Sequence, residues 1–202
     1  MNKTLPTILL CLALPLGAAA ASSNLIPNGT FDHASGPFTG WQTDYAWTKN
    51  KHYVENAARV SVKPSEAGKS GAAQLTAAGG GGTKIESIPI AFELGYKYTC
   101  EIDVKGGPYR LYFAGYQWEP GIRPHENPKP EELRLIYKSK VAKGQTSSWT
   151  HEKLEMPGLD VTPMAMKNLK EVRYVTVYVW MMETGWVDNV TVTRVPDPAT
   201  KP

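Results

Sequence analysis

Cysteine is scarce in this chain, with only Cys11 and Cys100 among 202 residues. Cys11 falls in the apolar segment at the start and lacks the flanking pattern of a lipid attachment site. No internal disulfide is therefore expected, so the fold must be held by its core or by a metal ion. Cys100 lies in the alternating stretch Tyr98–Val104, whose even positions are apolar, which favours a core residue over a reactive thiol.

Charge and helical periodicity are also limited. Charged residues make up 20% of the chain, the formal net charge is +3, and the charges are scattered rather than gathered in a basic stripe. This distribution argues against nucleic acid as a partner. No apolar run approaches the roughly 20 residues of a membrane-spanning helix, and amphipathic helical patterns are rare. Helical bundles, coiled coils and membrane-spanning proteins are therefore not expected.

The first residues have the pattern of an export signal. A charged start, Met1 to Lys3, precedes an apolar run from Leu5 to Leu16 and a series of small residues that ends near Ser23. We expect residues 1–21 to be a bacterial-type signal peptide and the protein to be secreted or periplasmic. Residues 22–195 then form one domain, and the proline-containing residues 196–202 form a flexible tail.

Short strand-like stretches separated by turn residues fill this domain. Glycine and proline are abundant, with 18 and 16 residues, and they fall between the alternating stretches. This organisation is typical of an all-β sandwich or barrel. The expected strands are Arg59–Val62, Ala72–Thr76, Lys84–Phe92, Tyr96–Val104, Tyr109–Tyr116, Leu133–Val141, Thr150–Met156, Val172–Met181 and Trp186–Val195.

The segment Glu119–Pro130 carries four prolines, too many for a central strand. It is predicted to be a stiff, extended loop. Such a loop either borders a functional site or is a plain connection, and the sequence leaves both readings open.

Two of the expected strands carry aromatic residues on the face opposite their aliphatic residues. In Val172–Met181 the aliphatic positions alternate with Tyr178 and Trp180. Because successive side chains of a strand point to opposite faces, these aromatic rings are predicted to lie outside the core. In the second strand, Leu111 and Phe113 point inward, and the residues predicted to point outward are Arg110, Tyr112, Tyr116 and Trp118.

Flat rings with a polar edge suit amphipathic ligands such as sugars. The predicted carbohydrate-binding residues are Arg110, Tyr112, Tyr116, Trp118, Tyr178 and Trp180, with Gln117 and Glu183 near enough to bind hydroxyls. The alternative is that these rings pack against each other or under the proline-rich loop.

Catalysis is not expected. The four histidines lack metal-ligand spacing, and the chain contains no G-x-S-x-G, H-E-x-x-H or phosphate-loop pattern. A glycosidase needs two carboxylates facing each other across the bond that it cleaves. The acidic residues near the proline-rich loop are more simply explained as solvated side chains.

Motifs at both ends carry a family resemblance. The segment Asn24–Asp32, followed by Gly40-Trp41, resembles the "N-L-I-x-N-G-x-F-E … G-W" opening of CenC-type carbohydrate-binding modules. Gly185–Val192 resembles the closing "G-x-x-x-D-D-V-x-V" strand of that family, with Asn189 in place of the second Asp. Shorter matches lie between them, at Glu66–Gly71, Leu94–Tyr98 and Ser148-Trp149. The resemblance implies a two-sheet antiparallel β-sandwich, the galactose-binding-like jelly roll.

The resemblance also implies a structural Ca²⁺ where the two ends of the domain meet. Its ligands would be the carbonyls of Thr30 and Lys69 and the carboxylates of Asp32, Glu66 and Asp188. Asp188 shares the parity of Val190 and Val192, and a carboxylate on the core side is costly unless it is paired or bound to a metal. Plain hydrogen-bonded acids are the alternative.

The expected function is thus that of an exported, non-catalytic protein that binds polysaccharide or glycoconjugate glycans through an aromatic sheet face. It would act alone or as an accessory to a separate glycoside hydrolase. The alternative is a structural or adhesive protein of the cell envelope that uses the same face to contact another protein. A small glycan-active enzyme is a third possibility.

Overall fold

The computed structural model describes residues 23–64, 71–77, 81–158 and 162–198. The predicted signal peptide, and Glu66 and Lys69 of the predicted calcium site, lie outside these residues. The described part contains antiparallel strands, one α-helix and three short 3-10 helices. No helix among the described residues is long and apolar enough to cross a membrane.

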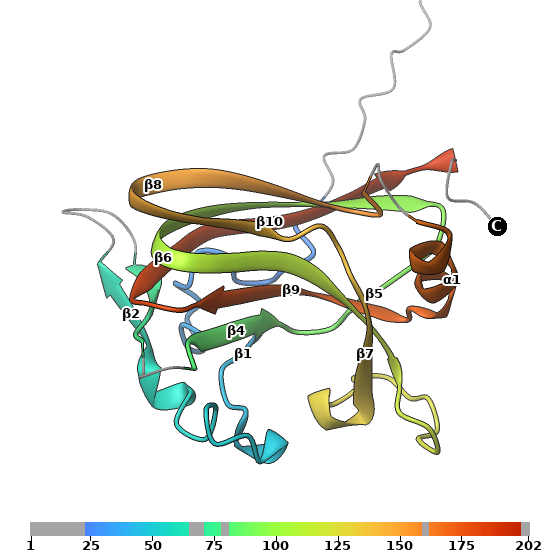
Figure 1. Ribbon diagram of the computed structural model, residues 1–202, viewed down its shortest axis with the longest axis horizontal. Helices are drawn as coiled ribbons and strands as arrows, with labels where there is room; N and C mark the ends of the chain where they lie inside the picture. Colours follow the sequence, from blue (N-terminus) through green and yellow to red (C-terminus); the bar gives the residue numbers. More distant parts are fainter. Residues whose placement is uncertain (1–22, 65–70, 78–80, 159–161, 199–202) are drawn as a thin grey trace, which may run out of the picture.

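The strands form two facing sheets that are joined through one long strand (Figure 1). The first, which we call the β10 sheet, has the order β8-β6-β10-β3-β2. Its strands are β2 (Val60–Pro64), β3 (Gly71–Leu75), the first half of β6 (Tyr96–Trp118), β8 (Ala142–Met156) and β10 (Gly185–Pro196).

The second, which we call the β9 sheet, has the order β7-β6-β9-β4-β1, and β5 also pairs with β9. Its strands are β1 (Trp41–Gln42), β4 (Thr83–Ser87), β5 (Ile90–Ala91), the second half of β6, β7 (Leu133–Lys138) and β9 (Tyr174–Met181). The expected all-β sandwich of two antiparallel sheets is confirmed.

Strand β6 passes from one sheet to the other at Gly106-Gly107-Pro108. Residues 96–106 pair with β10, and residues 109–116 pair with β9. Gly106 has a φ of +93°, and a Cβ atom there would lie 2.6 Å from the Thr184 carbonyl oxygen. Glycine is therefore required at this bend, and the two strands expected from the sequence are one continuous strand.

The core lies between the sheets and follows the alternation that the sequence predicts. Val175, Val177, Val179 and Met181 of β9 are fully buried, as are Leu111 and Phe113 of β6. Cys100 is also fully buried, which confirms its core position, and this burial raises the pKa of its thiol.

The helix α1 (Pro163–Glu171) was not expected from hydrophobic periodicity. Its signal is local: Thr162 caps the first turn by accepting a hydrogen bond from the Ala165 N–H at 3.2 Å, and Pro163 follows directly. Leu169 joins the core, and Asn168 donates to the Ile136 carbonyl of β7 at 3.2 Å. The helix therefore covers the end of the sandwich beside β7.

The start of the described chain lies along β10. Leu25 N donates to Val192 O at 2.8 Å, and Val190 N donates to Gly29 O at 2.9 Å. A Cβ atom at Gly29 would lie 1.8 Å from the Val190 oxygen, so only glycine permits this approach. The turn with Thr30 and Asp32 is thereby held beside the strand that carries Asp188.

Candidate functional site

Two segments far apart in the sequence extend from the outer face of the β9 sheet. One contains η1 (Ala46–Thr48) and η2 (Ala57–Arg59), and the other is the proline-rich loop, which ends in η3 (Pro130–Glu132). Figure 1 shows η1 and η3 on the side of the β9 sheet that faces away from the β10 sheet. The proline-rich segment is a loop as predicted, and it borders a cleft.

The cleft has a volume of about 210 Å³ and its floor is the outer face of β4, β6 and β9. Most of its lining is apolar or aromatic, with a few polar side chains at the floor. The lining residues are Gln42, Tyr45, Trp47, Thr48, Lys84, Glu86, Ser87, Ile88, Pro89, Tyr116, Pro128, Pro130, Leu133 and Thr176. A more open hollow of about 470 Å³ adjoins it across Ile88, Pro89 and Pro128.

A larger hollow, of about 570 Å³, lies between β7, β8 and α1. Gly158 and Thr162 line it, and these residues flank positions 159–161, which lie outside the described part of the chain.

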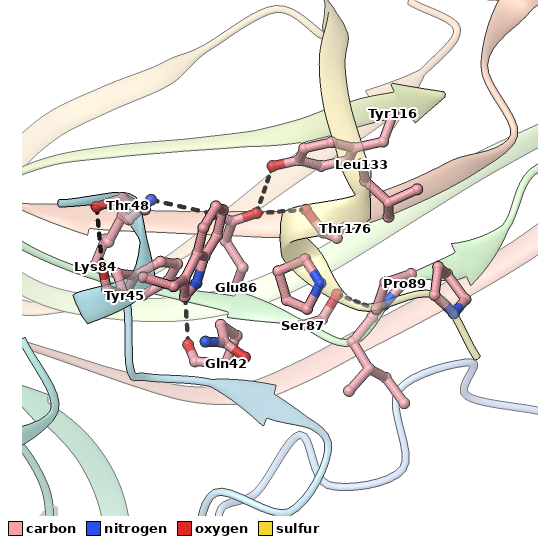
Figure 2. A pocket seen from close by; sticks show the side chains of 14 residues that line it. Gln42, Tyr45, Thr48, Lys84, Glu86, Ser87, Pro89, Tyr116, Leu133 and Thr176 are labelled. Atoms are coloured by element: carbon pink, nitrogen blue, oxygen red, sulfur yellow. Dashed lines mark hydrogen bonds and ion pairs between the residues drawn. The ribbon is translucent and has the colours of Figure 1, made fainter. Parts of the chain in front are cut away.

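Glu86 lies at the centre of the cleft floor (Figure 2). Its Oε2 atom accepts hydrogen bonds from the Tyr116 hydroxyl at 2.6 Å and from the Thr176 hydroxyl at 3.2 Å. Its Oε1 atom contacts Lys84 Nζ at 3.4 Å. The residue is only 8% exposed, so these partners supply the interactions that water would otherwise make.

Lys84 is surrounded by aromatic rings as well as by Glu86. Its Nζ atom lies 3.8 Å from the ring centre of Tyr45, 4.7 Å from that of Tyr53 and 5.3 Å from that of Tyr178. Burial lowers the pKa of Lys84, and the nearby Glu86 carboxylate opposes this shift. The ring faces and the Glu86 carboxylate both favour the charged form of Lys84.

Burial also raises the pKa of Tyr116, and the Glu86 charge adds to the shift. The Tyr116 hydroxyl is thus held as a neutral hydrogen-bond donor at any ordinary pH. The floor of the cleft combines one carboxylate, one caged ammonium group and fixed hydroxyl groups.

Asn56 ties the η1–η2 segment to the sheet. The residue is fully buried; its side-chain amide donates to the carbonyls of Thr43 and Lys84, both at 2.7 Å, and its Oδ1 atom accepts from Lys84 N at 3.0 Å. These bonds replace strand pairing along β4. They place Tyr45, Trp47 and Thr48 at one wall of the cleft.

The opposite wall comes from the proline-rich loop. Glu119 N donates to Glu132 O at 2.8 Å, which closes the base of the loop. The His125 ring lies 4.9 Å from the Trp118 ring, and His125 Nε2 contacts Glu132 Oε2 at 3.2 Å. Hydrogen bonds to the Glu126 carbonyl and to Glu132 raise the pKa of His125.

The six residues predicted to bind carbohydrate all lie on the outer face of the β9 sheet, but in three different surroundings. Tyr116 lines the cleft. Tyr112 and Tyr178 stack on each other, with ring centres 4.5 Å apart, and Tyr112 is only 7% exposed. Trp118 packs against His125 and Tyr174.

The remaining two residues, Arg110 and Trp180, contact each other. The Arg110 guanidinium lies 5.0 Å from the Trp180 ring centre, and Trp180 Nε1 donates to Gly81 O at 3.1 Å. Much of the aromatic area is therefore covered by other side chains. Sequence reasoning missed Trp47, Glu86 and Lys84, of which Trp47 is 45% exposed.

The predicted calcium ligands are partly described. Asp188 is 6% exposed, and its Oδ1 atom accepts from Asn189 N at 2.8 Å. The parity argument for Asp188 is wrong, because a bulge between Asp188 and Thr191, with Asn189 at a φ of +50°, shifts the register of β10. Asp188 pairs with Asp103 and does not continue the row of Val190 and Val192.

Asp32 accepts a hydrogen bond from the Thr30 hydroxyl at 2.5 Å. The members of the predicted set that are described thus offer oxygen atoms, which suit Ca²⁺. Within the described ranges, no three His, Cys, Asp or Glu residues group closely enough to hold a metal ion. The site stays a prediction, because Glu66 and Lys69 are not among the described residues.

Known protein-family profiles and curated protein sequences give no match to the chain. Solved structures with some similarity include the carbohydrate-binding module CBM4, at 17% identity and a TM-score of 0.46 over 84% of this chain and 99% of that one. The module TmCBM61 in complex with β-1,4-galactotriose has 14% identity and a TM-score of 0.44, over 86% of this chain and 100% of the other.

A family 11 carbohydrate-binding module from Clostridium thermocellum, in complex with a β-1,3-1,4-mixed-linked tetrasaccharide, has 14% identity and a TM-score of 0.39. It matches over 68% of this chain and 84% of that one.

Proposed function

We propose that this chain is an exported, non-catalytic carbohydrate-binding protein that takes polysaccharide or glycoconjugate glycans on the outer face of the β9 sheet. The observation that carries the proposal is the cleft around Glu86, which combines apolar walls with a buried, polar floor. Its chemistry suits an amphipathic ring. The resemblance carried by the motifs at both ends of the domain supports the same ligand class.

A sugar ring presents C–H groups on its faces and hydroxyl groups at its edge. The exposed indole of Trp47 supplies an aromatic surface for a sugar face. The Glu86 carboxylate accepts hydrogen bonds from hydroxyl groups, and the Gln42 amide both donates and accepts. Because Tyr116, Thr176 and Lys84 already hold the carboxylate, it is oriented before the ligand arrives.

The six predicted residues keep two roles in this proposal. Tyr116 contacts the ligand or orients Glu86 from the cleft floor. Arg110, Tyr112, Trp118, Tyr178 and Trp180 extend the ligand-binding face beyond the cleft, and their mutual packing keeps that face rigid.

The cleft favours binding over hydrolysis. Glycosidases use a pair of carboxylates on either side of the scissile bond. Among the described residues that line the cleft, Glu86 is the single carboxylate. The chain would therefore act alone or as an accessory to a separate glycoside hydrolase.

We also propose the structural Ca²⁺ site formed by the carbonyls of Thr30 and Lys69 and the carboxylates of Asp32, Glu66 and Asp188. The contact between Gly29 and Val190, which brings the Thr30–Asp32 turn to β10, supports it. A chelator should lower the melting temperature, and Ca²⁺ should restore it, in a calorimetric scan. An unchanged melting temperature would contradict the site.

The test of function is a glycan and polysaccharide array, probed in calcium-containing buffer with the chain from Ser22 onward. Selective binding to one glycan class is expected. Trp47→Ala should abolish that binding without loss of stability, because Trp47 is exposed. The matched control is Trp186→Ala, which removes a tryptophan from β10 and should leave binding intact. If the folded protein binds no glycan on the array, the proposal is wrong.

A cell-envelope structural or adhesive protein is the second candidate. Exposed apolar side chains beside the cleft favour it, since Trp47 is 45% and Ile88 43% exposed, and such residues also suit a protein interface. In that case Trp47→Ala would remove self-association or capture of an envelope protein, measured by sedimentation. The protein would then bind no glycan on the array.

A further inference from the structure

Three exposed cations lie on the outer face of the β9 sheet, beside the cleft. One of them comes from the first residues of β8, which pair with the second half of β6 and so extend into this sheet. In the strand register, Lys143 of β8 lies opposite Arg110, and Lys138 of β7 lies opposite Ala114. Residues 110, 112 and 114 of β6 share one face, so the three cations flank Tyr112 on that face. All three side chains are exposed. We call Arg110, Lys138 and Lys143 the cationic patch.

Aromatic rings hold two of these cations in position. The Arg110 guanidinium lies 5.0 Å from the Trp180 ring centre, and Lys138 Nζ lies 5.5 Å from the Tyr112 ring centre. Tyr112 is itself fixed by its stack on Tyr178. A ring attracts a cation but carries no net charge, so the positive charges remain available to an anion.

The cationic patch differs from most cations of the β10 sheet, because it has no acidic partner among the described residues, and Lys105 is the exception on the β10 sheet. On the β10 sheet, Lys97 and Lys153 both contact Glu155, at 2.9 and 3.5 Å, and Arg194 contacts Glu93 at 2.7 Å. No carboxylate within the described ranges forms an ion pair with Arg110, Lys138 or Lys143. The positive charge of the patch is therefore not neutralised locally.

The cationic patch continues the floor of the cleft. Tyr116 lies in the cleft, Lys138 lies level with residue 114 of β6, and Lys143 lies level with residue 110. At about 3.3 Å per residue, the patch begins roughly 7 Å and ends roughly 20 Å along the strand from Tyr116. A chain that leaves the cleft in this direction passes over all three cations.

We propose that the glycan bound by this face is anionic, with carboxylate or sulfate groups that contact Arg110, Lys138 and Lys143. The inference rests on the proposed function and specifies its ligand class. Arg110 offers a planar fork of donors that matches a carboxylate or sulfate group in a bidentate contact. Lys138 and Lys143 act as point charges for further groups along the chain.

A glycan suits the patch better than a nucleic acid does. The net charge of the whole chain is only +3, and the cationic patch consists of three residues. Nucleic-acid binding surfaces carry extended basic stripes that neutralise many phosphates. The aromatic cleft beside the patch favours a sugar ring as the neighbouring unit of the ligand.

The experiment compares charged and neutral forms of the same chain by calorimetric titration at constant calcium. Short oligogalacturonate is paired with its methyl ester, and dextran sulfate is paired with dextran. At least one charged form should bind roughly tenfold more tightly than its neutral partner, since a few exposed ion pairs together supply that factor. Added salt should reduce the difference because exposed charges are screened.

The variant Lys138→Ser/Lys143→Ser should remove most of this preference while keeping the melting temperature of the parent chain. The matched control, Lys105→Ser/Lys153→Ser, makes the same change in net charge on the β10 sheet and should keep the preference. A preference for oligogalacturonate identifies the carboxylate, and a preference for dextran sulfate identifies the sulfate. Either result supports the proposal.

Three outcomes would overturn it. Equal binding of charged and neutral forms, with both lost in Trp47→Ala, would remove the anionic class and leave the proposed function standing. Binding of neither the pairs nor any glycan of the array by folded protein would remove both. Binding of double-stranded DNA as tightly as the charged glycan would show a general polyanion surface.

Discussion

The two sheets of the sandwich share strand β6, but their outer faces carry charge in different ways. On the β10 sheet, lysines and acids alternate across strands and form pairs such as Lys97–Glu155 and His151–Asp103. Cations lie over aromatic rings on both sheets, at Lys105 and Arg194 of the β10 sheet and at Lys84, Arg110 and Lys138 of the β9 sheet. The β9 sheet differs because Arg110 and Lys138 lie near each other and form no ion pair with a described carboxylate. Two loops also border the β9 sheet and form the cleft.

This difference shows what separates a solvated face from a candidate binding face. An ion pair between exposed side chains balances the charges of both partners and so leaves little net charge to attract a ligand. A cation over a ring keeps its charge, and a buried carboxylate held by donors keeps a fixed direction. The candidate binding face that we propose therefore lies on the β9 sheet, although both sheets alternate apolar and polar positions.

The largest effect should come from the core that both faces share. Phe113 is fully buried between the sheets, so Phe113→Ala leaves a cavity and should lower the free energy of unfolding by about 3–5 kcal/mol. Denaturant unfolding measures this. Both sheets should unfold in a single transition. A variant in which one sheet unfolds before the other would contradict a common core.

A second substitution breaks the passage of β6 between the faces. Gly106→Ala places a Cβ atom 2.6 Å from the Thr184 oxygen at a φ of +93°, and it should cost about 2–3 kcal/mol of unfolding free energy. Gly121→Ala is the control. Its φ is +89° but no atom lies within 4 Å, so it should cost only about 1 kcal/mol. Equal costs would show that backbone conformation alone explains the loss.

The buried Glu86 carboxylate allows a hydrogen-bonded tyrosine of the β9 sheet to be compared with a tyrosine of the β10 sheet. Tyr116→Phe removes the shortest hydrogen bond to Glu86 and should cost about 1–2 kcal/mol of unfolding free energy, because the buried oxygen loses a donor. It should also weaken glycan binding. Tyr96→Phe in the β10 sheet is the matched control, since the Tyr96 hydroxyl has no hydrogen bond to another described residue, and it should be nearly neutral.

An ion pair on the charged face should matter less. Lys97→Ala should change the unfolding free energy by less than about 1 kcal/mol at neutral pH. The hydrogen bond from Lys97 lowers the pKa of Glu155 below its ordinary value of 4.5, so the contribution is present above that pH and is lost as pH falls through the lowered pKa. A loss comparable to that in Tyr116→Phe would contradict the contrast between the faces.

The smallest effect concerns the loop that borders the cleft. The pKa of His125 is raised above its ordinary value of 6.5, and that of Glu132 is lowered below 4.5. Both side chains are therefore charged at pH values between the lowered pKa of Glu132 and the raised pKa of His125. Their attraction weakens as pH rises through the raised pKa of His125, because the imidazole then loses its charge. An NMR titration should find the His125 pKa closer to 6.5 in Glu132→Gln. An unchanged value would remove Glu132 as a cause.

Much of the fold follows from local patterns. The alternation in Val172–Met181 predicted the buried aliphatic row and the outward direction of Tyr178 and Trp180. The glycines and prolines marked the turns. The alternating pattern did not reveal the bulge at Asn189, because a single extra residue changes the parity of β10 without any change in composition.

The candidate site was predicted only in part, because the exposure of each side chain depends on residues that are distant in the sequence. The sequence placed Tyr112 on the outer face, but it could not show that Tyr178 stacks on it. Lys84 and Glu86 looked like ordinary polar residues of a strand. Asn56, 28 positions away from Lys84, draws the η1–η2 segment over them and creates the wall of the cleft.

The sequence by itself determined that the chain forms strands, which side chains point to the core, and that one outer face is aromatic. These properties depend on the two-residue period of a strand, which is local. The tertiary structure alone decided which rings remain accessible, where the buried carboxylate lies and which cations lack an acidic partner among the described residues. Those properties depend on contacts between segments far apart along the chain, and no local period records them.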